Sequence, residues 1–132
     1  VKLPAYQALK GMMHGFIDLV FEADGKYYVC DYKSSYLGDD FNDYNQENLL
    51  KNIEKNHYDL QYLIYSLALH RYLNTTLPGY QFEQHFGGVF YLYLRGMTDD
   101  VQYKGAGVYH RKITIEEIQK LDQLFSGEPV NV

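Results

Sequence analysis

Cysteine is nearly absent from this chain, and its scarcity excludes several kinds of site. The single cysteine, Cys30, cannot form an intramolecular disulfide. It also cannot supply the several thiolates of a zinc or iron–sulfur centre. The five histidines have no paired His-x-x-x-His spacing, so no histidine zinc site is predicted. A chain with so little cysteine suits a reducing compartment, and we expect a cytoplasmic protein.

Long apolar runs and an excess of basic charge are missing as well. No apolar run approaches the roughly 18 residues of a membrane span, and no signal-peptide pattern opens the chain. No Walker-type glycine-rich loop is present, so we expect no ATP binding here. The net charge of −5 argues against a free-standing, non-specific DNA-binding protein, because phosphate contacts need clustered lysine and arginine. This charge does not exclude catalysis.

The composition that remains is that of one globular domain. The chain has 132 residues, of which 46% are hydrophobic and 22% charged, enough to bury a core. It begins at Val1 without a methionine, and we expect it to be a fragment of a longer chain. Strand-like and helix-like segments alternate, which predicts an α/β domain with a mixed sheet flanked by helices. The expected strands are at about 14–22, 26–33, 89–94 and 108–110, and the expected helices at about 44–56, 58–74 and from 115 onward.

Two pairs of polar residues have the spacing of helix capping boxes. Asp43 with Gln46 predicts the start of one helix, and Thr114 with Glu117 predicts the start of the last. The last helix should turn its apolar face inward; that face comprises Ile115, Ile118, Leu121 and Phe125.

Two longer segments are predicted to be buried. The helix at 58–74 is apolar nearly all round, which indicates burial on most sides. The apolar run from Val89 to Leu94 is continuous, which indicates a strand buried on both faces of the sheet.

The stretch from Gly15 to Ser35 carries the chemistry. Asp24-Gly25 separates two strand-like runs and is a strong hairpin signal. Because strand side chains alternate, Asp31 and Lys33 should share one face, with Cys30 and Tyr32 on the other. The preceding run contains Asp18 among apolar residues, where a carboxylate is costly unless it is paired or binds a cation. If the hairpin brings Asp18 beside Asp31, the two carboxylates could bind magnesium next to Lys33.

A purely structural interpretation of the same residues stays open. Asp31 and Lys33 could form a surface pair worth under about 1 kcal/mol. Asp18 could be a structural carboxylate with ordinary hydrogen-bond partners. Asp-x-Lys alone is common, but its combination with an aspartate in an apolar strand across a turn is much rarer.

Four segments together resemble a known family. They are Gly15-Phe-Ile-Asp-Leu-Val-Phe, Asp31-Tyr-Lys-Ser, the helix from Tyr58 to Leu73, and Phe86-Gly-Gly-Val-Phe-Tyr-Leu-Tyr-Leu-Arg-Gly. In this order they resemble the C-terminal nuclease domain of RecB, the exodeoxyribonuclease V beta subunit, within the PD-(D/E)xK nuclease superfamily. The resemblance covers about residues 11 to 125. It implies a restriction-endonuclease-like core with the N-terminal part of the domain truncated.

The resemblance also implies roles for individual residues. Asp18, Asp31 and Lys33 match the catalytic residues, and Mg²⁺, with Mn²⁺ as a substitute, would bind Asp18, Asp31 and the Tyr32 carbonyl. Gln61 and Tyr65 match a Gln-x-x-x-Tyr motif that helps hold DNA in this family, and Ser34 is a further expected DNA contact. The family's additional histidine ligand lies upstream of the first strand. His14 does not match its position, and an isolated fragment without that ligand is expected to cleave poorly.

The implied setting is a bacterial helicase–nuclease complex. An N-terminal ATP-driven helicase and RecC-like and RecD-like subunits would feed single-stranded DNA to the nuclease during repair of double-strand breaks by recombination. Two alternatives stay open. One is a nuclease-fold module that docks or guides DNA without chemistry, and the other is a metal-stabilised binding domain unrelated to DNA. Magnesium-dependent cleavage of single-stranded DNA would distinguish the nuclease interpretation from both of these alternatives.

Overall fold

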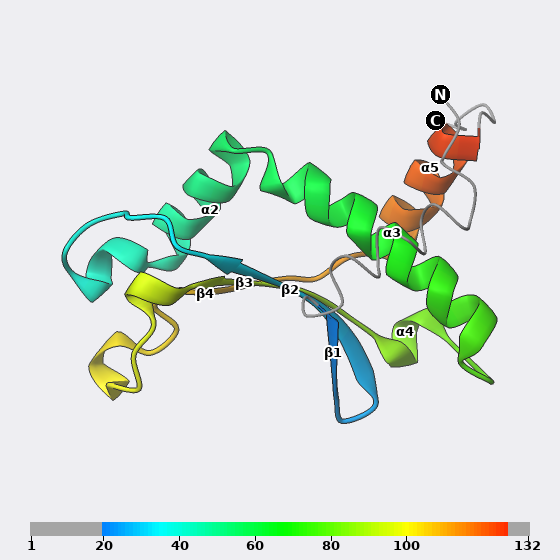
Figure 1. Ribbon diagram of the computed structural model, residues 1–132, viewed down its shortest axis with the longest axis horizontal. Coiled ribbons are helices and arrows are strands. Elements are labelled where there is room, and N and C mark those ends of the chain that lie inside the picture. The colour runs from blue at the N-terminus through cyan, green and yellow to red at the C-terminus, as the bar shows by residue number, and fades with distance from the viewer. Residues whose placement is uncertain (1–19, 127–132) are drawn as a thin grey trace.

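A four-stranded mixed sheet is the centre of the fold. The computed structural model describes residues 20–126, and its strands lie in the order β1-β2-β3-β4 (Figure 1). β1 pairs antiparallel with β2, β2 parallel with β3, and β3 antiparallel with β4. The strands are β1 (Val20–Ala23), β2 (Lys26–Lys33), β3 (Phe86–Tyr93) and β4 (Val108–Arg111). The predicted mixed sheet with helices is thus confirmed.

The hairpin between β1 and β2 forms at the predicted turn. Asp24 and Gly25 both have positive φ, 53° and 79°, as a two-residue type I′ turn requires. Residues 14–19 of the expected first strand lie outside the described residues.

The three longer helices lie together on one side of the sheet (Figure 1). α3 contacts β2, β3 and α5, whereas α2 contacts α3 and β4. The helices are α2 (Gln46–Lys55), α3 (Tyr58–Thr76), the short α4 (Phe82–His85) and α5 (Ile115–Ser126). Single 3₁₀ turns are present at η2 (Phe41–Tyr44), η3 (Leu94–Gly96) and η4 (Val101–Tyr103). Among residues 20–126, no helix combines the length and the apolar character needed to cross a bilayer.

Side chains of the two central strands and the helices above them form the core. Val29 on β2 and Val89 and Tyr91 on β3 are fully buried. The helices cover them with further buried residues, including Leu49, Ile53, Tyr62, Leu67, Leu69, Leu73, Ile118 and Leu121. Cys30 is buried too, as predicted, and burial raises the pKa of its thiol.

One of the two predicted capping boxes is wrong. Asp43 does not cap α2; it forms a capping box with Asp40 around η2 instead. α2 begins two residues later than expected, and the Asn45 side chain accepts a hydrogen bond from the Asn48 backbone N–H. The inserted 3₁₀ turn uses the same local chemistry, so spacing alone cannot tell the two starts apart.

The second capping box is confirmed. The Glu117 N–H donates to Thr114 Oγ1 at 3.2 Å, and the Thr114 N–H donates to Glu117 Oε1 at 3.2 Å. The predicted inward face of α5 is also confirmed, because Ile118 and Leu121 are buried and Ile115 and Phe125 pack against the core.

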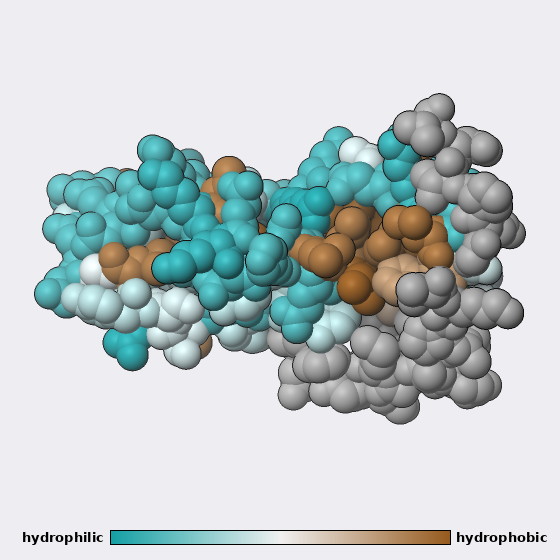
Figure 2. Space-filling model, turned by 90° about the horizontal axis from the view of Figure 1, so that it is seen from above, coloured by the Kyte–Doolittle hydropathy of each residue, from teal (hydrophilic) through white to brown (hydrophobic). Residues whose placement is uncertain are grey.

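Burial of α3 and β3 is less complete than predicted. α3 packs on the sheet with one side only, and Leu60 is 54% exposed on the other. The helical side of the molecule is largely hydrophilic, with an apolar patch where α3 and α5 lie (Figure 2). On β3, Phe90 and Leu92 are only half-buried, because the helices cover the opposite face. Leu94 lies beyond the strand, in η3, and is exposed.

Gly96 gives a test of this packing. A Cβ at this position would overlap the ring of Tyr44, a buried side chain whose hydroxyl bridges the Leu37 N–H and the Gly38 carbonyl. We expect Gly96→Ala to lower the free energy of unfolding by about 1–3 kcal/mol, measured by urea denaturation. In a Tyr44→Ala background the same methyl group should cost little, because the ring is gone. An equal loss in both backgrounds would contradict this packing.

Candidate active site

Asp31 and Lys33 lie side by side on the face of β2 that α3 covers. The strand geometry places both side chains on this face, and Lys33 Nζ is 2.8 Å from Asp31 Oδ2. Asp31 is only 4% exposed, and the Lys33 side chain is 14% exposed. The structure therefore has the adjacency that the Asp-x-Lys spacing predicts, and it buries the pair rather than leaving it on the surface.

The buried carboxylate is incompletely satisfied. The partner of Asp31 Oδ2 in the described chain is the Lys33 ammonium at 2.8 Å, which compensates the buried charge only in part. Burial raises the pKa of Asp31, and the Lys33 ammonium and the Tyr62 hydroxyl only partly offset this effect. A buried carboxylate whose charge is only partly compensated is the kind of oxygen ligand that a hard cation takes.

Two tyrosines of α3 complete the surroundings of the ion pair. Lys33 Nζ lies 3.2 Å from the ring centroid of Tyr58 and 5.7 Å from that of Tyr62. Such cation–π contacts attract the Lys33 ammonium group and fix its position. The Tyr62 hydroxyl faces the carboxylate, so burial and the charge of Asp31 both raise the pKa of Tyr62. Sequence reasoning missed Tyr62, because its four-residue spacing from Tyr58 places the two rings on one helix face but does not place that face against Lys33.

Gln61 and Tyr65 lie on α3, beside these tyrosines. Gln61 Nε2 donates to Tyr65 Oη at 3.1 Å. The Tyr65 ring packs edge-on against Tyr62, with the ring centroids 5.1 Å apart. Asp31, Tyr62, Tyr65 and Gln61 therefore form one continuous row of contacts. Gln61 is exposed at its outer end.

Ser34 and Tyr32 flank Lys33 at the end of β2. Ser34 is exposed, and its backbone carbonyl accepts a hydrogen bond from Arg95 Nε at 2.7 Å. The Tyr32 side chain is exposed on the opposite face of the sheet. Tyr32 can therefore contribute only its backbone to the Asp31 side of the strand.

Asp18 and His14 lie outside the described residues. Within residues 20–126, no three histidine, cysteine, aspartate or glutamate side chains cluster closely enough to hold a metal ion. Asp31 is thus the one predicted metal-binding carboxylate whose surroundings are described.

Comparison with known proteins decides the family. The model of the PD-(D/E)XK nuclease superfamily matches residues 3–128. The chain belongs to the PD-(D/E)XK nuclease superfamily. Nucleases of this superfamily generally use divalent metal ions, and the buried, partly compensated carboxylate of Asp31 fits such an ion.

Relatives of known name refine this assignment. The chain is 51% identical over 120 residues to the RecBCD enzyme subunit RecB of Haemophilus influenzae, covering 91% of this chain. It is 43% identical over 122 residues to the RecB subunit of Escherichia coli, covering 92%, and 34% identical over 131 residues to that of Mycolicibacterium smegmatis, covering 92%. The chain spans about a tenth of the length of these relatives, 10%, 10% and 12% respectively. Its resemblance to the RecB nuclease domain is thus confirmed.

The buried charge of this nuclease-superfamily site makes stability depend on pH. Because the pKa of Asp31 is higher in the folded than in the unfolded chain, its ionisation lowers the free energy of unfolding. This loss of stability is fully present at pH values above the pKa of Asp31 in the folded chain, and it disappears at pH values below the pKa of Asp31 in the unfolded chain. We expect Asp31→Asn to raise the melting temperature at about pH 8 and to match the parent near pH 3, measured by circular dichroism.

Asp99 supplies the matched control for this experiment. Asp99→Asn makes the same change on an exposed loop and should leave the melting temperature close to that of the parent. Equal melting temperatures for the parent and Asp31→Asn at pH 8 would contradict a costly buried carboxylate.

The Tyr62 hydroxyl gives a second prediction. Since it favours ionised Asp31, Tyr62→Phe should raise the pKa of Asp31 further, as followed by carbon-13 NMR titration of the Asp31 carboxyl group. Tyr65→Phe removes a hydroxyl that bonds Gln61 instead, and should leave this pKa nearly unchanged. The same Asp31 pKa in the parent and Tyr62→Phe would rule out the contact.

Proposed function

We propose that this chain is the magnesium-dependent DNA nuclease domain of a larger helicase–nuclease protein. The observation that carries the proposal is the buried Asp31–Lys33 ion pair in a chain of the PD-(D/E)XK superfamily. The relatives are named as RecB subunits of the RecBCD enzyme. By that likeness the protein acts in the bacterial cytoplasm with RecC-like and RecD-like subunits. It cleaves single-stranded ends during recombinational repair of double-strand breaks.

Asp18 is the proposed second carboxylate of the site. The described ladder pairs Val20 with Val29 and Phe21 with Tyr28. Continued by two residue pairs in the same register, it would pair Asp18 with Asp31 on one face of the hairpin. The two carboxylates, with the Tyr32 carbonyl, would then hold Mg²⁺, or Mn²⁺ in its place.

Each proposed catalytic residue has a separate role. A metal ion held by these residues would supply Lewis acidity toward the phosphodiester and the attacking water. Lys33 places a fixed positive charge where negative charge develops on the phosphoryl oxygens, and its burial makes that charge more effective than one in bulk water. Asp31 and the Tyr58 ring hold the ammonium in position, so little reorganisation is needed during reaction.

DNA contacts are proposed for the row that leads outward from the site. Gln61 and Tyr65 would contact the strand through the exposed amide and the tyrosine ring, since aromatic rings bind single strands by stacking. Ser34 would contact a phosphate beside Lys33, because it follows Lys33 directly and is exposed.

The proposal predicts a specific loss of cleavage. In the complete protein, Asp31→Ala should reduce magnesium-dependent cleavage of labelled single-stranded DNA by about 10³-fold or more, because a metal ligand is lost. Calorimetric titration of Mn²⁺ should show weakened binding in Asp31→Ala and Asp18→Ala. Asp99→Asn serves as the control and should behave like the parent.

The possible outcomes separate the candidate functions. Undiminished cleavage by Asp31→Ala would refute the catalytic assignment. Carboxylate-dependent metal binding by residues 1–132 without cleavage would point to a missing upstream histidine, and the complete chain should then be active. Neither metal binding nor cleavage by the complete chain would favour a docking or DNA-guiding module.

A further inference from the structure

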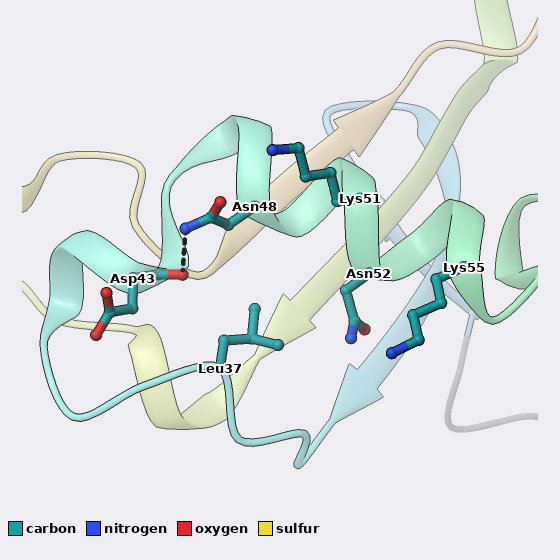
Figure 3. A pocket seen from close by; sticks show the side chains of 6 residues that line it. All are labelled: Leu37, Asp43, Asn48, Lys51, Asn52 and Lys55. Carbon is teal, nitrogen blue, oxygen red and sulfur yellow. Dashed lines mark hydrogen bonds between the residues drawn. The ribbon is translucent and has the colours of Figure 1, made fainter.

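A groove with cationic and amide side chains lies beside the candidate active site. It has a volume of about 310 Å³ and lies between α2 and the segment that follows β2 (Figure 3). Its lining residues are Leu37, Asp43, Asn48, Lys51, Asn52 and Lys55. None of them belongs to the predicted catalytic or DNA-contacting set. We call this feature the α2 groove.

One side-chain hydrogen bond connects the α2 groove to the catalytic strand. Tyr93 is paired with Lys33 across the β2–β3 ladder, and its side chain is fully buried on the same face. Its hydroxyl donates to Asn52 Oδ1 at 2.7 Å. The groove wall is therefore separated from the ion pair by a single side chain.

The groove presents nitrogen donors. With Asn52 Oδ1 occupied by Tyr93, the amide nitrogen of Asn52 is the part turned to the groove (Figure 3). The Lys55 side chain points into the same space, and no ion-pair partner of Lys55 is present in the part of the chain that the structure describes. Lys51 stands at the rim, and its exposed pair with Glu47, at 3.2 Å, is weak enough to exchange for another anion.

One acidic side chain belongs to the lining, and it lies at the far end. The Asp43 carboxylate accepts a hydrogen bond from the Asp40 N–H in the η2 capping box. Figure 3 shows this carboxylate turned away from Asn52 and Lys55. The end of the groove nearest Lys33 therefore carries positive charge and N–H donors.

We propose that the α2 groove binds a backbone phosphate of the nucleic-acid strand held at Asp31 and Lys33, with Lys55 and Asn52 as its donors. This inference rests on the proposed nuclease function and adds a binding position to it. A phosphodiester is an anion without donors, so it requires the ammonium and amide groups present there. Because the chain as a whole has a net charge of −5, a strand needs such local cations along its path.

The first test measures binding without cleavage. The complete protein in EDTA is titrated onto a fluorescent single-stranded oligonucleotide at several salt concentrations. Lys55→Gln should weaken binding about fivefold and reduce the slope of log K against log salt by about 0.7, as for one lost phosphate contact. Asn52→Asp keeps an acceptor for Tyr93 but places a carboxylate in the groove, and should weaken binding further.

Two controls exclude a general charge effect. Lys120→Gln removes the same charge from an exposed position on α5, at the other end of the molecule (Figure 1), and should leave the slope unchanged. Lys55→Arg should bind nearly as the parent does. If Lys55→Gln and Lys120→Gln change the affinity and the salt slope equally, the proposal is overturned.

A second test locates the phosphate. A set of oligonucleotides, each with one neutral methylphosphonate at a different position, is compared with the unmodified strand. At one position the methylphosphonate should weaken binding by the parent but should not weaken binding by Lys55→Gln, which has already lost that phosphate contact. Strictly additive losses at every position would also overturn the proposal. Parallel cleavage assays of the parent and Asp31→Ala keep the two ideas apart. If cleavage depends on Asp31 but Lys55→Gln binds the oligonucleotide as the parent does, only the proposed phosphate site in the α2 groove is rejected. If the parent does not cleave at all, the proposed nuclease function is rejected.

Discussion

The site depends on the burial of one negative charge beside one positive charge under a helix. Asp31 and Lys33 have little contact with water, so their attraction is screened less than that of a surface pair. A buried ion pair of this kind adds little to the free energy of unfolding, because the cost of removing both charges from water offsets much of their Coulomb attraction. Tyr58 and Tyr62 of α3 hold the Asp31–Lys33 ion pair in place, although the pair itself contributes little to stability. Its retention is easier to explain by chemistry than by packing, as is common at functional sites.

The hairpin and the Asp-x-Lys face were predictable because both follow from local rules. A two-residue turn fixes the strand pairing, and strand alternation fixes which side chains share a face. The environment of Lys33 was not predictable in the same way. Tyr58 and Tyr62 reach it only because the α3 crossover packs on β2, and no local pattern encodes that contact. The misplaced start of α2 has a similar origin, since Asp40, Asp43 and Asn45 all suit a cap.

The resemblance and the structure contribute different parts of the argument. Motifs in a single sequence identify residues such as Gln61 and Tyr65 but give no contacts for them. The structure places both in a row of side chains that begins at Asp31. It also shows groups outside any motif, above all Asn52, whose amide is oriented by the buried hydroxyl of Tyr93. Such supporting residues set the precision of a site, because they fix the rotamers of the groups that act.

The parallel pairing of β2 with β3 has a consequence for assembly of the site. Lys33 is paired with Tyr93, which lies 60 residues further along the chain. The hairpin residues precede α3 and β3 in the chain, so the face of β2 that carries Asp31 and Lys33 has no cover from these elements until they have docked. Contacts of such high sequence separation form late and slowly in folding. A nascent or partly unfolded chain therefore carries the Asp31 and Lys33 side chains without the buried, preorganised surroundings that the folded chain gives them.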